Sequence, residues 1–466
     1  MTTLDEVVLQ LVEEIQNTST VRRVSGDSLR KLNRSVRKLV SDGLSSYNQT
    51  ATLFGYASIH KNRNRYSTSR YSKQHSYRIH IARAYMGLIR LGYIREMKKG
   101  YFDGFGGFLT RYRATEKLRR LFADVDVRVL PVLMSLDEPD EVIQVKEVVK
   151  ERDAKTGKLK KKSIWIDYED THKTHEMRLN VDKINKYIRK VWIDIEQDDD
   201  DWKELRYRLK QESDADTPPH NLASRTLYRV FSDTSFESGG RFYGGWWQNI
   251  PKEFRTKLLI NGKRTVEFDY SGLHPALLYA RVNAGIPDDP YEIGLDPKHR
   301  KQVKKAFNAM LNADNDLRSP PKGLSIKDMG LPWRDLKQRI KDKHSGISDY
   351  FGTGEGLRLQ YIDSCIAEEL MLRFIEEKSG TALLPVHDSF IVHHGYADEL
   401  KDMMLEIFER DFGAEVRVKE LEKALTNNAN FTLNPTPADI GTLLQQMDVG
   451  HELRLDAFRK YNLSQG

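Results

Sequence analysis

The chain has 466 residues, with 75 Lys and Arg against 68 Asp and Glu, 39% hydrophobic residues and one cysteine. This length allows two or three domains with their own cores, and the composition excludes disordered, collagen-like and coiled-coil arrays. No stretch approaches the roughly 18 uninterrupted apolar residues of a membrane span, and the N-terminus is acidic and amphipathic, so we expect a soluble, cytoplasmic protein without a membrane partner. Cys365 alone can form neither an intrachain disulfide nor a cysteine-based zinc site.

Positive charge is concentrated in residues 52–122, which contain sixteen Lys and Arg and three acidic residues. This stretch carries +13 and the whole chain +7, so the remainder carries −6. A basic block on a mildly acidic body is typical of a protein with a polyanionic partner, most simply nucleic acid. A solvated basic face is the alternative that charge alone leaves open.

The first region, residues 1–125, has the element order of a small nucleic-acid-binding domain. Apolar residues at helical spacing predict a helix within 77–91 that stops at Gly92. Strands are expected at 93–97 and 108–113, on either side of a Gly-rich turn, and a basic helix at 116–122. This order resembles the winged-helix domains of replication initiators and transcription regulators. A generic α+β domain is the alternative.

A basic and aromatic segment, residues 60–80, lies inside that region. Its arginines can neutralise phosphates, while its tyrosines can stack on unpaired bases. A flexible basic loop that binds nothing is an equally simple interpretation. The residues expected to contact nucleic acid here are Arg63, Arg65, Arg70 and Tyr71.

The second region, residues 126–216, is interpreted as a connecting, thumb-like segment. A hairpin is expected with its turn at 153–157 and a returning strand at 163–168, followed by helices at 181–195 and 202–211. The acidic run 198–201 favours a solvated linker over a cation site, since four consecutive aspartates do not converge on one ion. The prolines at 218 and 219 then mark a boundary.

The third region presents two aspartates, each directly after a strand pattern. The alternating residues 264–268 lead to Asp269, and a turn then enters a helix at 273–282. The apolar run 381–386 leads to Asp388, and a strand at 390–392 returns. Either aspartate alone would be read as a turn residue or a helix cap. Presented at adjacent strand ends, both can hold a pair of Mg²⁺ ions, which prefer carboxylate and phosphate oxygens and support in-line nucleotidyl transfer.

Four ordered motifs surround these aspartates. They are Gly240-Arg241, Gln248-Asn249-Ile250-Pro251, Asp269-Tyr270-Ser271 followed by Leu273, and His387-Asp388-Ser389-Phe390. Over about residues 225–415 the chain resembles family A DNA polymerases and single-subunit, phage-type RNA polymerases. The serine after Asp388 is similar to the RNA polymerases, whereas Gln248-Asn249-Ile250-Pro251 is similar to bacterial DNA polymerase I.

The resemblance implies an α+β, right-hand polymerase fold. Palm and fingers would occupy residues 217–430, and residues 431–466 would be a helical tail. It also implies that Asp269 and Asp388 are catalytic and bind two Mg²⁺ ions, for which Mn²⁺ can substitute. The implied partners are a DNA or RNA primer-template and nucleoside triphosphates. No acidic cluster resembling a proofreading exonuclease is evident before residue 217.

A fingers helix is expected over residues 297–312. Arg300 and Lys304 are four residues apart, so they share a helical face that can hold a triphosphate, and Asn308 and Asn312 continue it. A solvated helix face is the alternative. The family has an aromatic residue or Met where this chain has Asn308, and Tyr-Gly where it has Asn312-Ala313. This departure puts sugar discrimination in doubt.

Other residues receive roles only through the resemblance. His274 stands where DNA polymerases have a glutamate that excludes the 2′-hydroxyl, and Tyr270 lies beside the expected nucleotide. Arg241, Gln248 and Asn249 would contact primer and template, and His387 the primer terminus. The helix expected at 360–376 would pack beneath the palm.

The sequence therefore predicts a template-directed polymerase that adds nucleotides to a 3′-hydroxyl. Ribonucleotide use, as in a primase or an RNA polymerase, stays open, and so does template-independent transfer. The alternative is a nucleic-acid-binding replication initiator or regulator whose polymerase domain is inactive.

Overall fold

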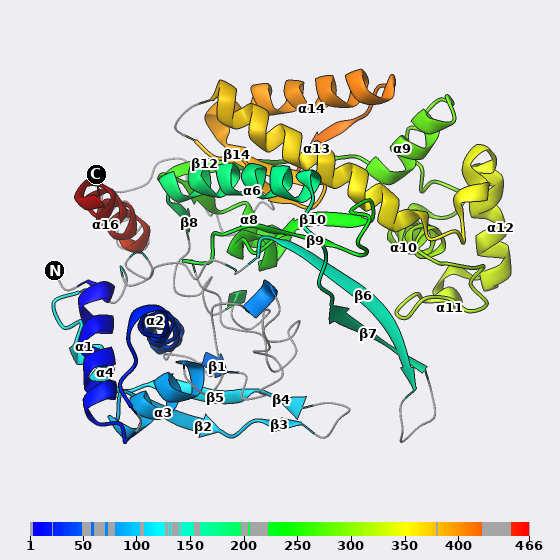
Figure 1. The fold of residues 1–466 in the computed structure, drawn as a ribbon. Helices are drawn as coiled ribbons and strands as arrows, with labels where there is room; N and C mark the ends of the chain where they lie inside the picture. The colour runs from blue at the N-terminus through cyan, green and yellow to red at the C-terminus, as the bar shows by residue number, and fades with distance from the viewer. Residues whose placement is uncertain are drawn as a thin grey trace, which may run out of the picture.

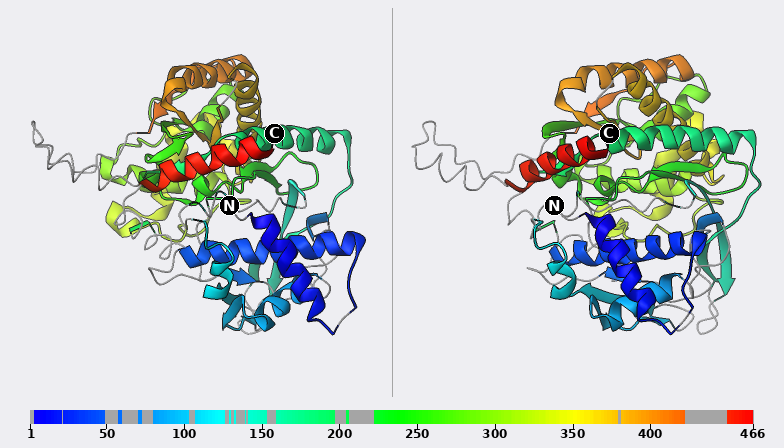
Figure 2. Two further views of the ribbon diagram at one scale, coloured as in Figure 1. Left: turned by 90° about the vertical axis from the view of Figure 1, so that its left-hand side faces the viewer. Right: turned by 60° about the vertical axis from the view of Figure 1, so that its left-hand side comes forward.

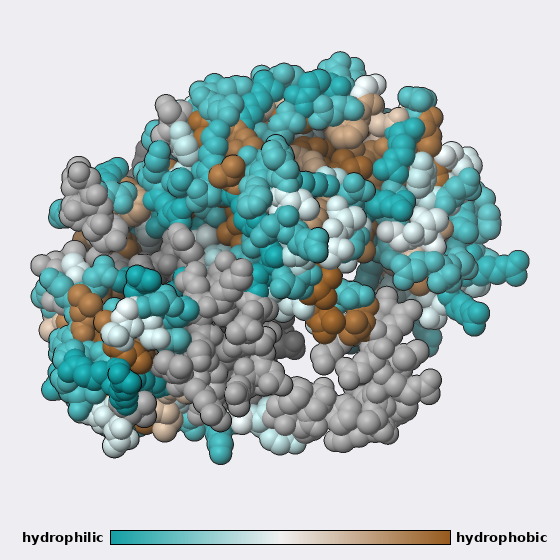
Figure 3. Space-filling model, viewed as in Figure 1, coloured by the Kyte–Doolittle hydropathy of each residue, from teal (hydrophilic) through white to brown (hydrophobic). Residues whose placement is uncertain are grey.

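The structure is a computed structural model of the chain. It describes residues 3–20, 22–48, 57–59, 70–72, 80–102, 107–125, 129, 132, 139, 141–152, 159–196, 204–205, 222–378, 381–421 and 449–465. Among these residues no helix is both long and apolar enough to span a membrane. The face seen in Figure 3 is mainly hydrophilic.

The N-terminal part is a small helical layer on a three-stranded sheet. The helices α1 (Leu4–Asn17), α2 (Gly26–Asn48) and α3 (Ala82–Arg90) lie beside strands in the order β1 (Ala57–Ile59), β5 (Thr110–Ala114), β2 (Ile94–Lys98). Helix α1 starts at a capping box formed by Thr3 and Glu6, which satisfies two free backbone donors. The apolar stripe of α1 is buried, and Ile15 packs where Gly87 of α3 leaves room.

The elements expected in this part are present, with small shifts in their bounds. Helix α3 ends just before Gly92, whose φ of +74° is a left-handed conformation that glycine adopts without strain. Strands β2 and β5 are followed by α4 (Glu116–Arg120). Between them β3 (Tyr101–Phe102) pairs with β4 (Gly107–Phe108) as an extension of the hairpin. Residues 60–69 and 73–79 of the basic and aromatic segment lie outside the described residues.

The segment predicted to connect the domains supplies strands to both larger sheets. Strand β6 (Ile143–Arg152) pairs with β7 (Leu159–Trp165) and also, in parallel, with β9 (Tyr228–Phe231), which pairs with β10 (Gly239–Tyr243). Helix α6 (His172–Lys190) begins earlier than the sequence pattern predicted. It ends before residues 193–195, which form strand β8 (Ile193–Ile195) instead of the expected helical end. Only residues 204 and 205 of the helix expected at 202–211 are described.

A six-stranded sheet carries the two aspartates. Its order is β13 (Leu384–Val386), β14 (Ser389–His393), β12 (Lys263–Tyr270), β11 (Leu258–Ile260), β8, and β15 (Val418–Glu420) also pairs with β12. Helices α13 (Glu355–Glu377) and α14 (Ala397–Phe412) lie above this sheet, at the opposite end of the molecule from α1 and α2 in every view (Figures 1 and 2). The mixture of helices and sheets is an α+β fold.

A helical insertion separates β12 from α13. It contains α9 (Leu273–Arg281), η6 (Pro297–His299), α10 (Arg300–Leu311), α11 (Ile326–Met329), α12 (Trp333–Lys343) and η7 (Ser345–Tyr350). Two short elements precede β11, namely η5 (Trp246–Asn249) and α8 (Lys252–Arg255). The η8 turn (His394–Tyr396) leads into α14. In Figure 1, α10, α11 and α12 gather at one side of the six-stranded sheet.

The C-terminal helix α16 (Val449–Gln465) is tied to strand β8 by a buried ion pair. Arg454 donates two hydrogen bonds of 2.8 Å to the carboxylate of Asp194, and Trp192 donates one of 2.6 Å from its indole. The rings of Phe458 and Trp192 are in contact, with centroids 5.5 Å apart. Residues 449–465 of the expected helical tail therefore pack against the large sheet, whereas residues 431–448 lie outside the described residues.

Replacing Asp194 with Asn should destabilise the protein strongly. The change removes the negative charge from the buried ion pair that joins α16 to β8, and breaking such a pair costs about 3–5 kcal/mol of unfolding free energy. Guanidinium unfolding curves measure the loss. Asp182→Asn, which breaks an exposed pair with Lys186, is the matched control and should cost less than about 1 kcal/mol. Equal losses in the two variants would contradict the role given to Asp194.

Candidate active site

The register of two antiparallel strands brings Asp269 and Asp388 together. Asp269 of β12 lies opposite Ser389 of β14, so Asp388, one residue earlier, sits at the same end of the pair. The backbone N–H of Tyr270 donates to the carbonyl of Asp388 at 3.4 Å, which closes the turn against β12. Both aspartates are half-buried. The strand ends expected from the sequence therefore meet as predicted, except that Asp269 belongs to the strand itself.

The two carboxylates influence each other. Burial and then the charge of Asp388 raise the pKa of Asp269 to about 7, while Lys304 and Lys252 act in the opposite direction. Within the described residues neither carboxylate has an ion-pair partner. Two adjacent carboxylates that share no protein cation form a strongly anionic point at the strand ends.

A buried glutamate fixes the register beneath the aspartates. Glu267 shares the face of Asp269, because side chains alternate along a strand. It accepts two hydrogen bonds of 2.9 Å from Arg255 and one of 2.6 Å from the hydroxyl of Ser389. Ser389, which the sequence linked to RNA polymerases, thus bridges the two strands that carry the aspartates.

Helix α10 brings its basic face to one side of the carboxylates. Lys304 is exposed, and its charge acts on Asp269. Arg300 donates to Asp289 through Nε at 2.6 Å and through Nη2 at 3.0 Å. Both cations lie near the ring of Tyr291, at 5.2 Å for the Arg300 guanidinium and 5.6 Å for the Lys304 ammonium. The predicted shared face of Arg300 and Lys304 is present, with Arg300 paired to a carboxylate.

Tyr291 links this basic face to the aspartates. Burial raises the pKa of its hydroxyl, the charges of Asp388 and Asp269 raise it further, and Arg300 opposes them. Within the described residues this hydroxyl has no hydrogen-bond partner. A Cβ placed on Gly272, in the turn after Asp269, would lie 3.9 Å from it. The phenol therefore occupies the space between α10 and the strand ends.

The two asparagines expected on the same helical face differ in position. Asn308 is half-buried, and no hydrogen bond of its side chain is found within the described residues. Asn312 ends the helix, and its side-chain amide donates to the carbonyl of Asn308 at 2.7 Å. Asn312 thus serves the helix end in this structure.

An ion-pair cluster lies within electrostatic reach of Asp388. Arg241 of β10 donates from Nε to both oxygens of Asp363 at 3.0 and 3.1 Å, and also from Nη2. His274 Nε2 lies 3.1 Å from Asp363 and 3.4 Å from Arg241. Asp363, on α13, is almost completely buried. The cluster connects β10, α9 and α13 around the residue expected to act on the sugar.

Gly240 permits this close packing. Its φ is +83°, and an added Cβ would lie 2.7 Å from the Phe231 ring and 2.9 Å from the Ser364 hydroxyl. Any other residue would push β10 away from α13. The glycine of the Gly240-Arg241 motif therefore has a physical reason, namely the approach of Arg241 to Asp363.

Tyr270 and Gln248 face the protein interior. The Tyr270 hydroxyl donates to the carbonyl of Met404 at 2.7 Å, on the α14 side of the sheet. Tyr270 is next to Asp269 on the strand, so alternation sends it to the opposite face. The Gln248 amide donates to the carbonyls of Phe242 and Pro385, both at 3.0 Å. Neither side chain is presented to a ligand in this structure, contrary to the roles expected for them.

The other expected primer and template contacts are exposed. Asn249 is exposed beside Gln248. His387 is exposed next to Asp388 and has a φ of +59°, which is uncommon for a residue other than glycine. Its ring meets Tyr243 of β10, with centroids 5.9 Å apart. A strained backbone thus holds His387 outward at the turn.

The basic and aromatic segment gives a different result. Arg63 and Arg65 lie outside the described residues. Arg70 is buried and paired with Asp167 at 2.5 Å and Asp170 at 2.9 Å, and the Tyr71 hydroxyl donates to the carbonyl of Ile166 at 2.7 Å. Both side chains bind the protein itself, so the expected contacts of Arg70 and Tyr71 with nucleic acid have no support in this geometry.

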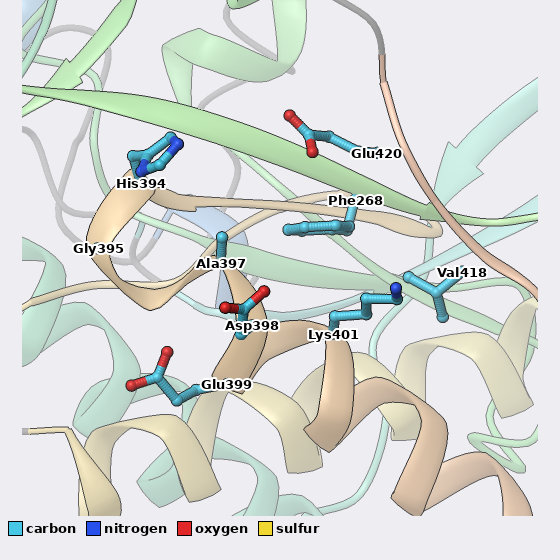
Figure 4. A pocket seen from close by; sticks show the side chains of 9 residues that line it. All are labelled: Phe268, His394, Gly395, Ala397, Asp398, Glu399, Lys401, Val418 and Glu420. Atoms are coloured by element: carbon cyan, nitrogen blue, oxygen red, sulfur yellow. The ribbon is translucent and has the colours of Figure 1, made fainter.

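A hollow of about 310 Å³ lies elsewhere (Figure 4). Phe268, on the face of β12 opposite to Asp269, lines it together with residues of η8, α14 and β15, among them Asp398 and Glu399. This hollow is on the reverse face of the sheet. It is therefore separate from the aspartate pair.

Four residues of the site were not expected from the sequence: Glu267, Asp289, Tyr291 and Asp363. Asp363 occurs in a helix whose pattern is amphipathic, and only its burial distinguishes it. Glu267 had a usable signal, because a glutamate on the face of Asp269 in an otherwise apolar strand needs a partner.

Comparisons with known proteins give little further information. No protein-family model matches the chain, and no curated protein matches it. Among solved structures, the chain is similar to the POL domain of Pol1 from M. smegmatis in complex with DNA primer-template and dNTP. The identity is 10% and the TM-score 0.30, and the match covers 90% of this chain and 66% of that one. A likeness of this size does not establish a shared activity.

Replacing Asp269 with Asn should stabilise the protein in a pH-dependent manner. A carboxyl whose pKa is about 7 when folded and 3.8 otherwise costs stability on ionisation. The cost is absent below about pH 4 and complete above about pH 7, so Asp269→Asn should gain stability over wild type as the pH rises through that window. Thermal unfolding without divalent cations measures the difference, and Asp398→Asn on the reverse face is the reference variant. A gain that does not change with pH would contradict the shifted pKa.

Proposed function

We propose that this protein transfers nucleotides from nucleoside triphosphates to the 3′-hydroxyl of a nucleic acid strand. One observation carries the proposal: the β12–β14 register sets Asp269 beside Asp388, with the basic face of α10 next to them. The two carboxylates match the charge of the metal ions, and the neighbouring cations match the charge of the triphosphate bound to them. The Asp398 hollow offers no such arrangement.

The donor set fits divalent cations of the Mg²⁺ or Mn²⁺ type. The observation that supports this fit is a half-buried pair of carboxylates that has no counter-ion in the part of the chain that the structure describes. Among the described residues no three His, Cys, Asp or Glu side chains form a metal cluster, so substrate phosphates and water would complete the coordination. When bound, such ions activate the attacking hydroxyl and stabilise the leaving pyrophosphate. Asp269 and Asp388 are the residues that would hold them.

The chain's own residues would bind and orient the nucleotide. Lys304 is available to a phosphate, whereas Arg300 must first exchange Asp289 for a phosphate oxygen. Tyr291 would keep both cations turned toward the carboxylates. His274, held by Asp363, would contact the sugar.

Primer and template contacts are proposed for the exposed residues around the turn. Asn249 and His387 are exposed, His387 next to Asp388, and the charge of Arg241 interacts with that of Asp388. The N-terminal part, with its winged-helix order of elements, would hold the nucleic acid. The two sequence features that pointed to an RNA or a DNA product both make contacts within the protein. Ser389 donates a hydrogen bond to Glu267, and Gln248 donates to a backbone carbonyl. An incorporation assay is therefore the way to distinguish ribonucleotide from deoxyribonucleotide substrates.

A second candidate is a nucleic-acid-binding initiator or regulator without polymerase activity. Two features of α10 favour it. Asn312 caps its own helix, and Arg300 is paired with Asp289. Asp269 and Asp388 repel each other and have no ion-pair partner among the described residues, which favours the enzyme, since a binding protein has no need for such a pair.

Primer extension distinguishes the two candidates. A labelled primer, with and without a complementary template strand, is offered dNTPs or NTPs separately in Mg²⁺. We expect template-dependent extension that Asp388→Asn reduces at least about 1,000-fold, because each carboxylate is needed to hold the ions. The sugar that is incorporated then identifies the product.

Asp398→Asn is the matched control for the extension assay. It makes the same chemical change on the reverse face of the sheet, so incorporation should equal that of wild type. If wild type binds the primer-template but incorporates nothing, the polymerase proposal falls and the binding protein is the better account.

A further inference from the structure

The segment formed by residues 247–255 is bonded at both ends to the strands around the aspartate pair. At its first end, the Trp247 indole donates to the carbonyl of Pro385 at 3.1 Å, and the Gln248 amide donates to the same carbonyl at 3.0 Å. Pro385 lies in β13, two residues before His387. The first end of the segment is therefore held beside the turn that joins β13 to β14.

The second end of the segment is helix α8, which is bonded to β12. Arg255 donates two hydrogen bonds of 2.9 Å to Glu267. Glu267 lies two residues before Asp269, so the two carboxylates share a face of the strand. Arg255 also donates to the carbonyl of Ile250 at 3.3 Å, which closes the segment on itself. Helix α8 therefore lies on the face of β12 that carries Asp269.

Lys252 is an exposed cation between these two ends. It precedes Arg255 by three residues in α8, so the two side chains are neighbours on the helix surface. The charge of Lys252 acts on Asp269, as that of Lys304 does from α10. In the part of the chain that the structure describes, Lys252 forms no hydrogen bond and no ion pair. A lysine that only offset the charge of Asp269 would gain most by pairing with it, so the Lys252 ammonium is available to a ligand.

The two lysines differ in their surroundings. Lys304 belongs to the basic face of α10, near the ring of Tyr291, where the proposed function places the triphosphate. Lys252 shares its segment with Asn249, and that segment is bonded next to the turn of His387. Helices α8 and α10 lie apart in Figure 1. Lys252 is therefore grouped with the exposed residues proposed to contact the nucleic acid, and Lys304 with those proposed to contact the triphosphate.

We propose that Lys252 binds a backbone phosphate of the strand that supplies the 3′-hydroxyl. A reaction at the aspartates brings two anions together, the triphosphate and this strand, and each is stabilised by a cation of its own. The cations of α10 match the triphosphate, and Lys252, on a separate element, matches the strand. The inference rests on the proposed function, because that function places the strand end at the aspartates.

Replacement of single phosphates tests the contact. A labelled primer-template duplex carries an uncharged methylphosphonate at one position at a time near the primer 3′ end. Fluorescence anisotropy measures its affinity from about 50 to 200 mM salt. Lys252→Gln should bind the unmodified duplex roughly tenfold more weakly at about 50 mM salt, with a log–log salt slope lower by about one. At one modified position, wild type should lose the same affinity and Lys252→Gln should lose nothing further.

Two other lysine variants are the matched controls. Lys263→Gln makes the same change at the exposed start of β12, at the opposite end of the strand from Asp269, and should bind the duplex as wild type does. Lys304→Gln should raise the KM for the nucleotide and leave the salt slope unchanged. Lys252→Gln should leave that KM unchanged.

Two results would overturn the inference. One is a raised nucleotide KM with an unchanged salt slope in Lys252→Gln, because the lysine would then bind the triphosphate. The other is an equal loss of duplex affinity in Lys252→Gln and Lys263→Gln, because the loss would then reflect net charge alone. Circular dichroism that matches wild type shows that the three variants are folded.

Primer extension in the same preparations separates this inference from the proposed function. If wild type extends the primer and Lys252→Gln binds the duplex as wild type does, the inference fails and the polymerase proposal stands. If Lys252→Gln loses the phosphate contact while wild type extends nothing, Lys252 binds nucleic acid and the polymerase proposal fails.

Discussion

The close approach of two carboxylates at one end of the β12–β14 pair is the constraint on which the rest of the site depends. The two negative charges repel each other, and burial makes ionisation of Asp269 less favourable still. Both effects raise the pKa of Asp269. The strands nevertheless hold their register, because Glu267 binds Arg255 on one side and the Ser389 hydroxyl on the other. These neighbouring contacts thus offset the repulsion between the two aspartates, which by itself destabilises the folded strand pair.

The ion pairs around the aspartates differ in how readily they can exchange partners. On α10 the cations are exposed, and the Arg300–Asp289 pair can exchange its partner at little cost. Asp363 is buried and its partners Arg241 and His274 are largely shielded from solvent, so this cluster is expected to stay fixed. Under the proposed function, the triphosphate would bind to the α10 cations, and the sugar would contact the fixed Asp363 cluster.

Local patterns in the sequence were sufficient for much of this arrangement. Alternation and turn residues located the strands around Asp269 and Asp388, and helical spacing located the shared face of Arg300 and Lys304. The alternation of side chains along the strand, extended by one residue, would also have predicted that Tyr270 is buried in the core. Asp363 and Tyr291 could not be found in this way, because their roles come from contacts across the fold. Arg70 and Tyr71 have the composition of a nucleic-acid motif, yet acidic partners about 100 positions away bury Arg70, a pairing that no local window contains.

Cleavage by bound iron tests the central claim, that Asp269 and Asp388 form one cation site. With Fe²⁺ and ascorbate in place of Mg²⁺, radicals cut the backbone near the ion, and the fragments are mapped by mass spectrometry. The account predicts cuts near both residues 269 and 388, suppressed by added Mg²⁺ and lost together in Asp269→Asn. Cuts near only one of the two, or cuts that survive this substitution, would contradict it.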